Sequence, residues 1–202
     1  MLRHLLYFLV CTSLTARTLD AGAMVDQALA AIGGRDKVLT LFRIKETFHF
    51  GSTPEPEEGK KRSSRESVIE PPKFWWLGKK ERADEPAKYD VWAWTLGILT
   101  DPGTKTEALP ALEDEGCQCL RLRVSGTVEP AMDLWFSADT HLLRRLDWRG
   151  DFYRFSEWRE HDGVKYASRT VIHKLASGKP WFFHDVTGVE RLAELPEGLS
   201  RP

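Results

Sequence analysis

The sequence lacks the motifs that identify most enzymes and nucleotide-binding proteins. It has no Gly-x-Ser-x-Gly elbow, Walker loop, dinucleotide glycine fingerprint or His-Glu-x-x-His motif. It also lacks a basic excess, since 29 lysines and arginines are set against 30 acidic residues, whereas binding to a phosphate backbone needs positive charge. We therefore expect a protein that is not an enzyme and has neither a cofactor nor a nucleic-acid partner.

Long apolar runs are also missing, because the longest at the N-terminus, Leu5 to Cys11, is shorter than the roughly 20 residues that cross a bilayer. Arg3 and His4 precede this run and small residues follow it, which is the layout of a signal peptide rather than of a core helix. Cleavage is expected after Ala16 or Ala23. We predict a leader at 1–23, a single domain at 24–202 without a transmembrane segment, and a soluble periplasmic location.

Cysteine is scarce as well, with three in 202 residues. Cys11 falls in the predicted leader. Cys117 and Cys119 would share one face of a strand, where they could bind a soft metal or oxidise to a disulfide. Cα atoms two apart on a strand lie near the upper limit for a disulfide, so two small buried side chains are the preferred interpretation.

The rest of the composition, 42% apolar and 29% charged, is typical of a folded domain. Val25, Ala28, Leu29 and Ile32 recur at helical spacing, and Gly33-Gly34 should end that helix.

From Leu41 onward, short aromatic and β-branched runs separated by turn residues predict an antiparallel meander. The fold class is therefore α+β, mainly antiparallel β. Strands are expected at 42–50, 65–69, 74–77, 89–99, 117–125, 131–136, 141–149, 152–159, 164–175 and 181–189, with a hairpin loop at 52–64 and irregular chain at 101–116.

The first predicted strand alternates well except at one position. Ile44, Phe48 and Phe50 fall on one face with Phe42, and Glu46 interrupts this apolar row. Glu46 and His49 have the i, i+3 spacing of some metal sites, but on a strand they point in opposite directions.

Two histidines support a weaker, enzymatic alternative. If Ser177-Gly178 forms a two-residue turn, His173 and His184 become diagonal neighbours on one sheet face. A metal would still need further ligands, so no metal site is predicted.

Tryptophan is abundant, with eight residues beside ten phenylalanines. Such side chains suit the wall of an apolar pocket or an interface, although a curved sheet could also use them to fill its core.

Three segments resemble the superfamily of LolA/LolB-like periplasmic lipoprotein carriers, and most closely its uncharacterised exported members. They are Ala28-Leu29-Ala30-Ala31-Ile32-Gly33-Gly34, Asp133-Leu134-Trp135-Phe136 and Ser177-Gly178-Lys179-Pro180-Trp181. The resemblance spans 24 to about 199. It implies a curved half-barrel with an N-terminal helix packed on its concave face, which receives acyl chains or other hydrophobic ligands.

We therefore expect a binding protein of the envelope whose ligand is a hydrophobic small molecule or an acyl chain, with a lipoprotein or another envelope protein as a further partner. The alternative is a module that binds proteins or polysaccharides through an exposed aromatic patch or its edge strands. The candidate ligand-binding residues are Phe48, Phe50, Trp75, Trp92, Trp94 and Trp135.

Overall fold

The computed structural model describes residues 20–82 and 85–201. Residues 1–19 of the predicted leader lie outside this part of the chain. Helix α1 (Ala21–Ala31) begins two residues before Ala23, so cleavage there would remove its first turn, whereas cleavage after Ala16 would leave it whole. The leader itself stays a prediction. No helix in the described part of the chain is long and apolar enough to cross a membrane.

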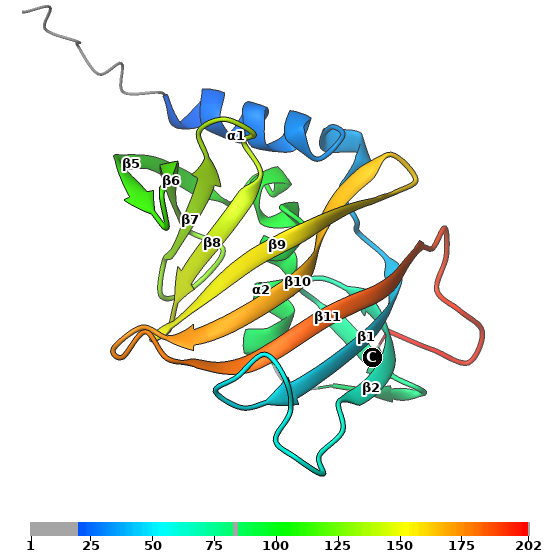
Figure 1. Cartoon of the computed structure of the whole chain (residues 1–202). Coiled ribbons are helices and arrows are strands. Elements are labelled where there is room, and N and C mark those ends of the chain that lie inside the picture. The colour runs from blue at the N-terminus through cyan, green and yellow to red at the C-terminus, as the bar shows by residue number, and fades with distance from the viewer. Residues whose placement is uncertain (1–19, 83–84, 202) are drawn as a thin grey trace, which may run out of the picture.

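One antiparallel sheet dominates the fold (Figure 1). Within the described residues it has eleven strands, in the order β4-β3-β2-β1-β11-β10-β9-β8-β7-β6-β5. All neighbours follow one another along the chain except β1 and β11, so the first and last strands pair in the interior of the sheet. The strands are β1 (Phe42–Phe50), β2 (Ser63–Glu70), β3 (Phe74–Leu77), β4 (Lys80–Glu81), β5 (Lys105–Asp114), β6 (Cys117–Ser125), β7 (Met132–Ser137), β8 (Leu143–Trp148), β9 (Asp151–His161), β10 (Val164–Lys174) and β11 (Pro180–Arg191).

The sheet curves without closing, since β4 and β5 remain as separate edges. Helix α2 (Glu85–Trp94) lies inside the curve, and α1 lies across one end of it (Figure 1). The short helix η1 (Arg35–Lys37) links α1 to β1. This arrangement confirms the predicted curved half-barrel with its N-terminal helix.

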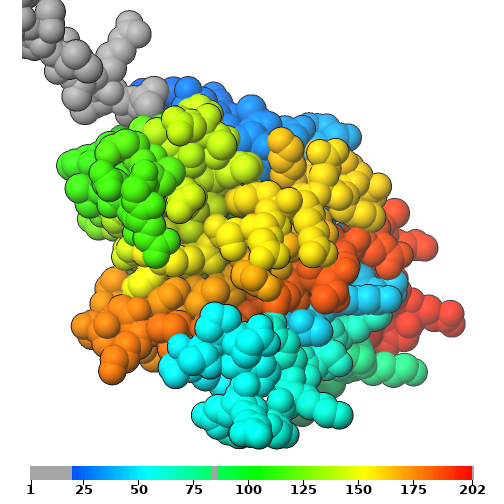
Figure 2. Space-filling model, viewed as in Figure 1, coloured from blue at the N-terminus to red at the C-terminus, as the bar shows by residue number. Residues whose placement is uncertain are grey.

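The core lies between the concave face and the helices. The apolar stripe of α1 is buried as predicted, and it joins one cluster with residues of α2 and the inward-facing strand positions. A second, smaller cluster forms where the C-terminal segment packs on Leu41, Val68 and Trp76. The hairpin loop between β1 and β2 projects from the sheet, as seen in cyan on the face shown in Figure 2.

The strand predicted at 89–99 is wrong. This segment forms the end of α2 and then helix η2 (Gly97–Thr100), which are joined through Leu96 in the left-handed conformation. Residues 92–99 are all buried, so helical and strand periodicities cannot be told apart in this segment.

The irregular chain predicted at 101–116 is wrong as well, because it contains β5. This edge strand is largely exposed, so it carries no alternation of apolar and polar residues. Its pairing with β6 is irregular between Leu109 and Leu112, on either side of Pro110, which cannot donate a ladder hydrogen bond.

Gly33 allows the end of α1 to dock against the β9–β10 turn. Its φ of 114° lies in a region that L side chains rarely adopt. The N–H of Lys165 donates to the Ile32 carbonyl at 2.8 Å, and a Cβ on Gly33 would lie 2.0 Å from the carbonyl oxygen of Gly163.

We therefore expect Gly33→Ala to lower the free energy of unfolding by about 2 kcal/mol or more, because strain and a backbone clash add. Gly188→Ala is the matched control, since its nearest neighbour would be at 3.8 Å and its φ is not in the glycine region. Urea denaturation of both variants measures the difference, and equal stabilities would contradict this account.

Candidate ligand-binding pocket

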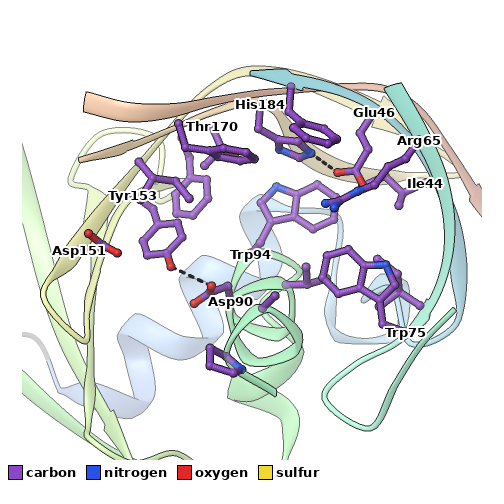
Figure 3. Close-up of a pocket in the computed structure, with 18 of the residues that line it drawn as sticks. Ile44, Glu46, Arg65, Trp75, Asp90, Trp94, Asp151, Tyr153, Thr170 and His184 are labelled. Atoms are coloured by element: carbon purple, nitrogen blue, oxygen red, sulfur yellow. Dashed lines mark hydrogen bonds and ion pairs between the residues drawn. The ribbon is translucent and has the colours of Figure 1, made fainter. Parts of the chain in front are cut away.

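A pocket lies between α2 and the concave face of the sheet (Figure 3). Its volume is about 330 Å³, at the lower end of the range for small-molecule sites. Strands β1, β2, β3, β9, β10 and β11 supply most of the wall. The rest comes from Arg82 and from Pro86, Ala87, Asp90, Val91 and Trp94 of α2.

The mouth is aromatic. Phe48 and Phe50 extend from β1, and Trp181 and Phe182 from β11, with ring centroids 5.1–6.2 Å apart among neighbours. Phe50 is 67% exposed, which is unusual for a phenylalanine in a strand. These four rings form an apolar lip at the entrance.

The interior of the pocket is lined by apolar side chains whose positions are fixed by core packing and by one hydrogen bond. Ile44, Ile69 and Phe155 are buried in the core cluster behind the lip. Trp94 reaches in from α2, and its indole Nε1–H donates to the Ala167 carbonyl at 3.0 Å, which fixes the orientation of the ring.

A buried carboxylate divides the lip from the interior. Alternation along β1 directs Glu46 to the concave face between Ile44 and Phe48, where it is 3% exposed. Arg65 Nε–H donates to its Oε1, and His184 Nε2 hydrogen-bonds to its Oε2 (Figure 3). Burial raises the pKa of Glu46, but the hydrogen bonds from His184 and Arg65 outweigh this effect, so its pKa lies below the ordinary value of 4.5.

Arg65 is itself held by aromatic rings. Its guanidinium lies 4.8 Å from the Phe48 ring centroid and 5.1 Å from that of Trp75. Arg82 lies over Trp75 as well, at 4.7 Å. Two guanidinium groups therefore contact one indole on this side of the pocket.

The opposite wall carries carboxylates. The Tyr153 hydroxyl donates to Asp90 Oδ2 at 2.8 Å (Figure 3). Asp151 pairs with Lys174 at 2.8 Å, and the Lys174 ammonium lies 4.5 Å from the Trp181 ring. The polar groups at this end are thus engaged with one another.

Four of the six predicted ligand-binding residues, Phe48, Phe50, Trp75 and Trp94, line the pocket. The structure does not bring the other two to it. Trp92 is buried in the core beside Tyr89. Trp135 lies outside the core cluster, between the guanidinium groups of Arg121 and Arg145 at 4.4 and 4.6 Å. Contact with a ligand stays a prediction for all six.

Sequence reasoning missed the polar residues of the pocket. Glu46, which breaks the apolar row of β1, was the available signal, because a carboxylate on a buried face needs partners. The partners, Arg65 and His184, follow only from the pairing of β1 with β2 and β11.

The predicted neighbourhood of His173 and His184 is wrong. A register shift between Ile172 and His173 pairs Thr170 with His184. His184 lines the pocket, whereas His173 stacks on Phe152 at 4.5 Å, away from it.

Cys117 and Cys119 are both free thiols, and Cys117 is only partly buried, so the prediction of two buried side chains holds for Cys119 alone. Cys119 is fully buried, and burial and then the neighbouring Cys117 raise its pKa to about 11, which makes it a poor nucleophile. In residues 20–82 and 85–201, no group of three histidine, cysteine or acidic side chains could hold a metal ion.

Solved structures share this architecture. A LolA superfamily protein from Nitrosomonas europaea superposes with a TM-score of 0.58 at 8% identity, covering 89% of this chain and 96% of that one. A putative outer membrane lipoprotein-sorting protein domain from Vibrio parahaemolyticus gives 0.51 at 9% identity, covering 86% and 93%. No family model matches the sequence, and no curated protein matches it. The chain has a LolA-like fold, which confirms the resemblance at the level of the fold.

The depressed pKa of Glu46 predicts a specific acid sensitivity. A carboxyl group whose pKa is lower when folded stabilises the protein above the unfolded value, and this contribution is lost as the pH falls through the folded value. We expect wild-type stability to fall more steeply than that of Glu46→Gln between about pH 6 and about pH 3.

Glu66→Gln is the control, because Glu66 lies on the neighbouring strand with half of its side chain exposed and pairs with Arg43. Its stability curve should keep the acid slope of the wild type. Urea denaturation across the pH range measures all three proteins, and parallel curves for wild type and Glu46→Gln would refute the assignment.

Proposed function

We propose that this protein is a non-enzymatic envelope protein that binds one hydrophobic ligand, such as an acyl chain, in the pocket beneath its sheet. The observation that carries the proposal is an open cavity of about 330 Å³ that runs from the exposed Phe50 to the buried Trp94 and Ile44. Phe48, Phe50, Trp75 and Trp94 are the proposed contact residues.

The size of the pocket limits the ligand. A cavity of roughly 150 Å³ accommodates one benzene molecule, so the volume here is about twice that. It suits a single chain of moderate length or one ring system, and it is small for several acyl chains at once.

The chemistry of the lining favours binding over catalysis. The carboxylate of Glu46 is paired with both Arg65 and His184, and its lowered pKa makes it a weak general base. The LolA-like fold supports a periplasmic location and a ligand of the lipoprotein type, both as parts of the proposal.

The rival function, an interaction module with an exposed aromatic patch, has less support. The large apolar side chains exposed in the described part of the chain include no tryptophan, and they are Phe50, Leu77, Leu112 and Leu175. Of these, Phe50 belongs to the mouth of the pocket.

Native mass spectrometry with lipid extraction, on protein purified from the exported fraction, is the direct test. We expect a hydrophobic species to copurify at a ratio near one to one. Clean apo protein that also fails to bind hydrophobic probes would favour the interaction module instead.

A chain-length series tests the pocket as the binding site. Each CH₂ that enters an apolar cavity contributes about 0.8 kcal/mol, so the affinity for linear alcohols should rise about fourfold per CH₂ until the cavity is full and then level off. Isothermal titration calorimetry measures the series, and an affinity independent of chain length would contradict pocket binding.

A pocket-filling variant is the second test of the pocket as the binding site. Ala87→Trp places an indole in the wall formed by α2 and should lower the affinity at least about tenfold, because it occupies the space of the ligand. Ala111→Trp, on the exposed edge strand β5, is the matched control and should bind as the wild type does.

A further inference from the structure

Arg65 has hydrogen-bond donors without an acceptor in the described part of the chain. A guanidinium group has five N–H donors, of which Nε–H of Arg65 is bonded to Glu46. Across residues 20–82 and 85–201, neither of its Nη atoms has a hydrogen-bond acceptor. The Arg65 side chain is 25% exposed and forms part of the pocket wall, where Figure 3 shows it reaching in from β2.

The orientation of this group is fixed before any ligand arrives. The bond to Glu46 anchors one edge of the guanidinium, and the rings of Phe48 and Trp75 contact it at 4.8 and 5.1 Å. A planar fork held in this way loses little entropy on binding, and its geometry matches the paired oxygens of a carboxylate or a phosphate.

The charges of the pocket favour an anion on this side. Arg65 lies against Trp75, whereas Asp90 and Asp151 lie on the opposite wall (Figure 3). Glu46 is the nearest carboxylate to the Arg65 guanidinium, and its two oxygens are already hydrogen-bonded to Arg65 and His184. An anionic group would therefore be attracted to Arg65 and repelled by Asp90 on the far wall, where Asp151 is already paired with Lys174.

We infer that the pocket selects amphiphiles with one anionic oxygen headgroup, a carboxylate or a phosphate, which accepts hydrogen bonds from the two Nη groups of Arg65. The chain lies against the apolar lining of the same pocket, which extends from the aromatic lip to Ile44 and Trp94. This inference rests on the proposed function, because headgroup and chain share the same pocket.

Calorimetric titration of the full chain with four ligands of equal chain length tests it: dodecanoate, dodecyl phosphate, dodecanol and dodecyltrimethylammonium. We expect one or both anions to bind about tenfold more tightly than dodecanol, since hydrogen bonds to charged groups are the stronger class. Comparing dodecanoate with dodecyl phosphate distinguishes a fatty-acid carboxylate from a phosphate headgroup. Acetate and inorganic phosphate should not bind measurably without a chain.

The decisive variant is Arg65→Met, in which the ratio of the dodecanol and anion dissociation constants should fall from about ten to about one. Arg43→Met is the matched control: Arg43 is on the adjacent strand, is similarly exposed at 29%, and pairs with Glu66 and Glu190 outside the pocket. It should keep the full preference for the anion.

Loss of Arg65 leaves the buried Glu46 with one partner fewer, so the double variant Glu46→Gln with Arg65→Met guards against unfolding. In this double variant, the ratio of the dodecanol and anion dissociation constants should also be near one.

The outcomes separate the two proposals. If no amphiphile binds, the proposed function fails and this inference fails with it. If dodecanol and the anions bind equally, or if Arg65→Met keeps the preference, the pocket function stands and the anion site is wrong. Tighter binding of dodecyltrimethylammonium would place the selective charge on the carboxylate wall and would equally overturn the inference.

Discussion

The buried carboxylate of Glu46 is the constraint on which the arrangement of the pocket depends. A carboxylate on the concave face of a sheet is costly unless its oxygens are hydrogen-bonded, and its two partners come from different parts of the chain. Arg65 lies directly opposite on β2, and His184 lies on β11, nearly at the other end of the sequence. The pairing of the first strand with the last therefore satisfies the charge as well as the ladder of β1.

The same carboxylate specifies the register of these strands. A slip of one residue between β1 and β2 would turn every side chain of one strand to the opposite face, which would separate Glu46 from Arg65 and expose Ile44. The bulge between Lys45 and Glu46 in the β1–β11 pairing shifts the register at this point, so that Phe48 lies opposite His184 and Glu46 reaches it diagonally. Local irregularity in the ladder thus positions the polar groups of the pocket.

The sequence was sufficient for the parts of the fold whose pattern is local. Alternation in β1 and the helical stripe of α1 predicted these elements, because each has one buried and one exposed face. It failed for the segment 92–99, which ends α2 and continues into η2 and is buried on every side, and for β5, which is exposed on most of its surface. Neither extreme leaves a periodic signal. For the pocket, alternation divides side chains between two faces but does not say which face is concave, so Trp135 was grouped with Trp75 although arginines cover it on the outer side.

The cost of the charged group favours a role beyond stability. Replacing a buried ion pair by apolar residues of similar volume is often neutral or stabilising, so a fold that needed only a stable core could have continued the apolar row of Ile44 and Phe48 through position 46. Instead Glu46, Arg65 and His184 occupy the wall of a cavity between an aromatic lip and an apolar interior. Apolar surface alone would accept any chain that fits, whereas a fixed guanidinium with unused donors adds a chemical requirement at one point. Specificity of this kind arises from polar groups that only one class of ligand can satisfy. Arg65, which lies beside the lip, is the group that would select the ligand in this pocket.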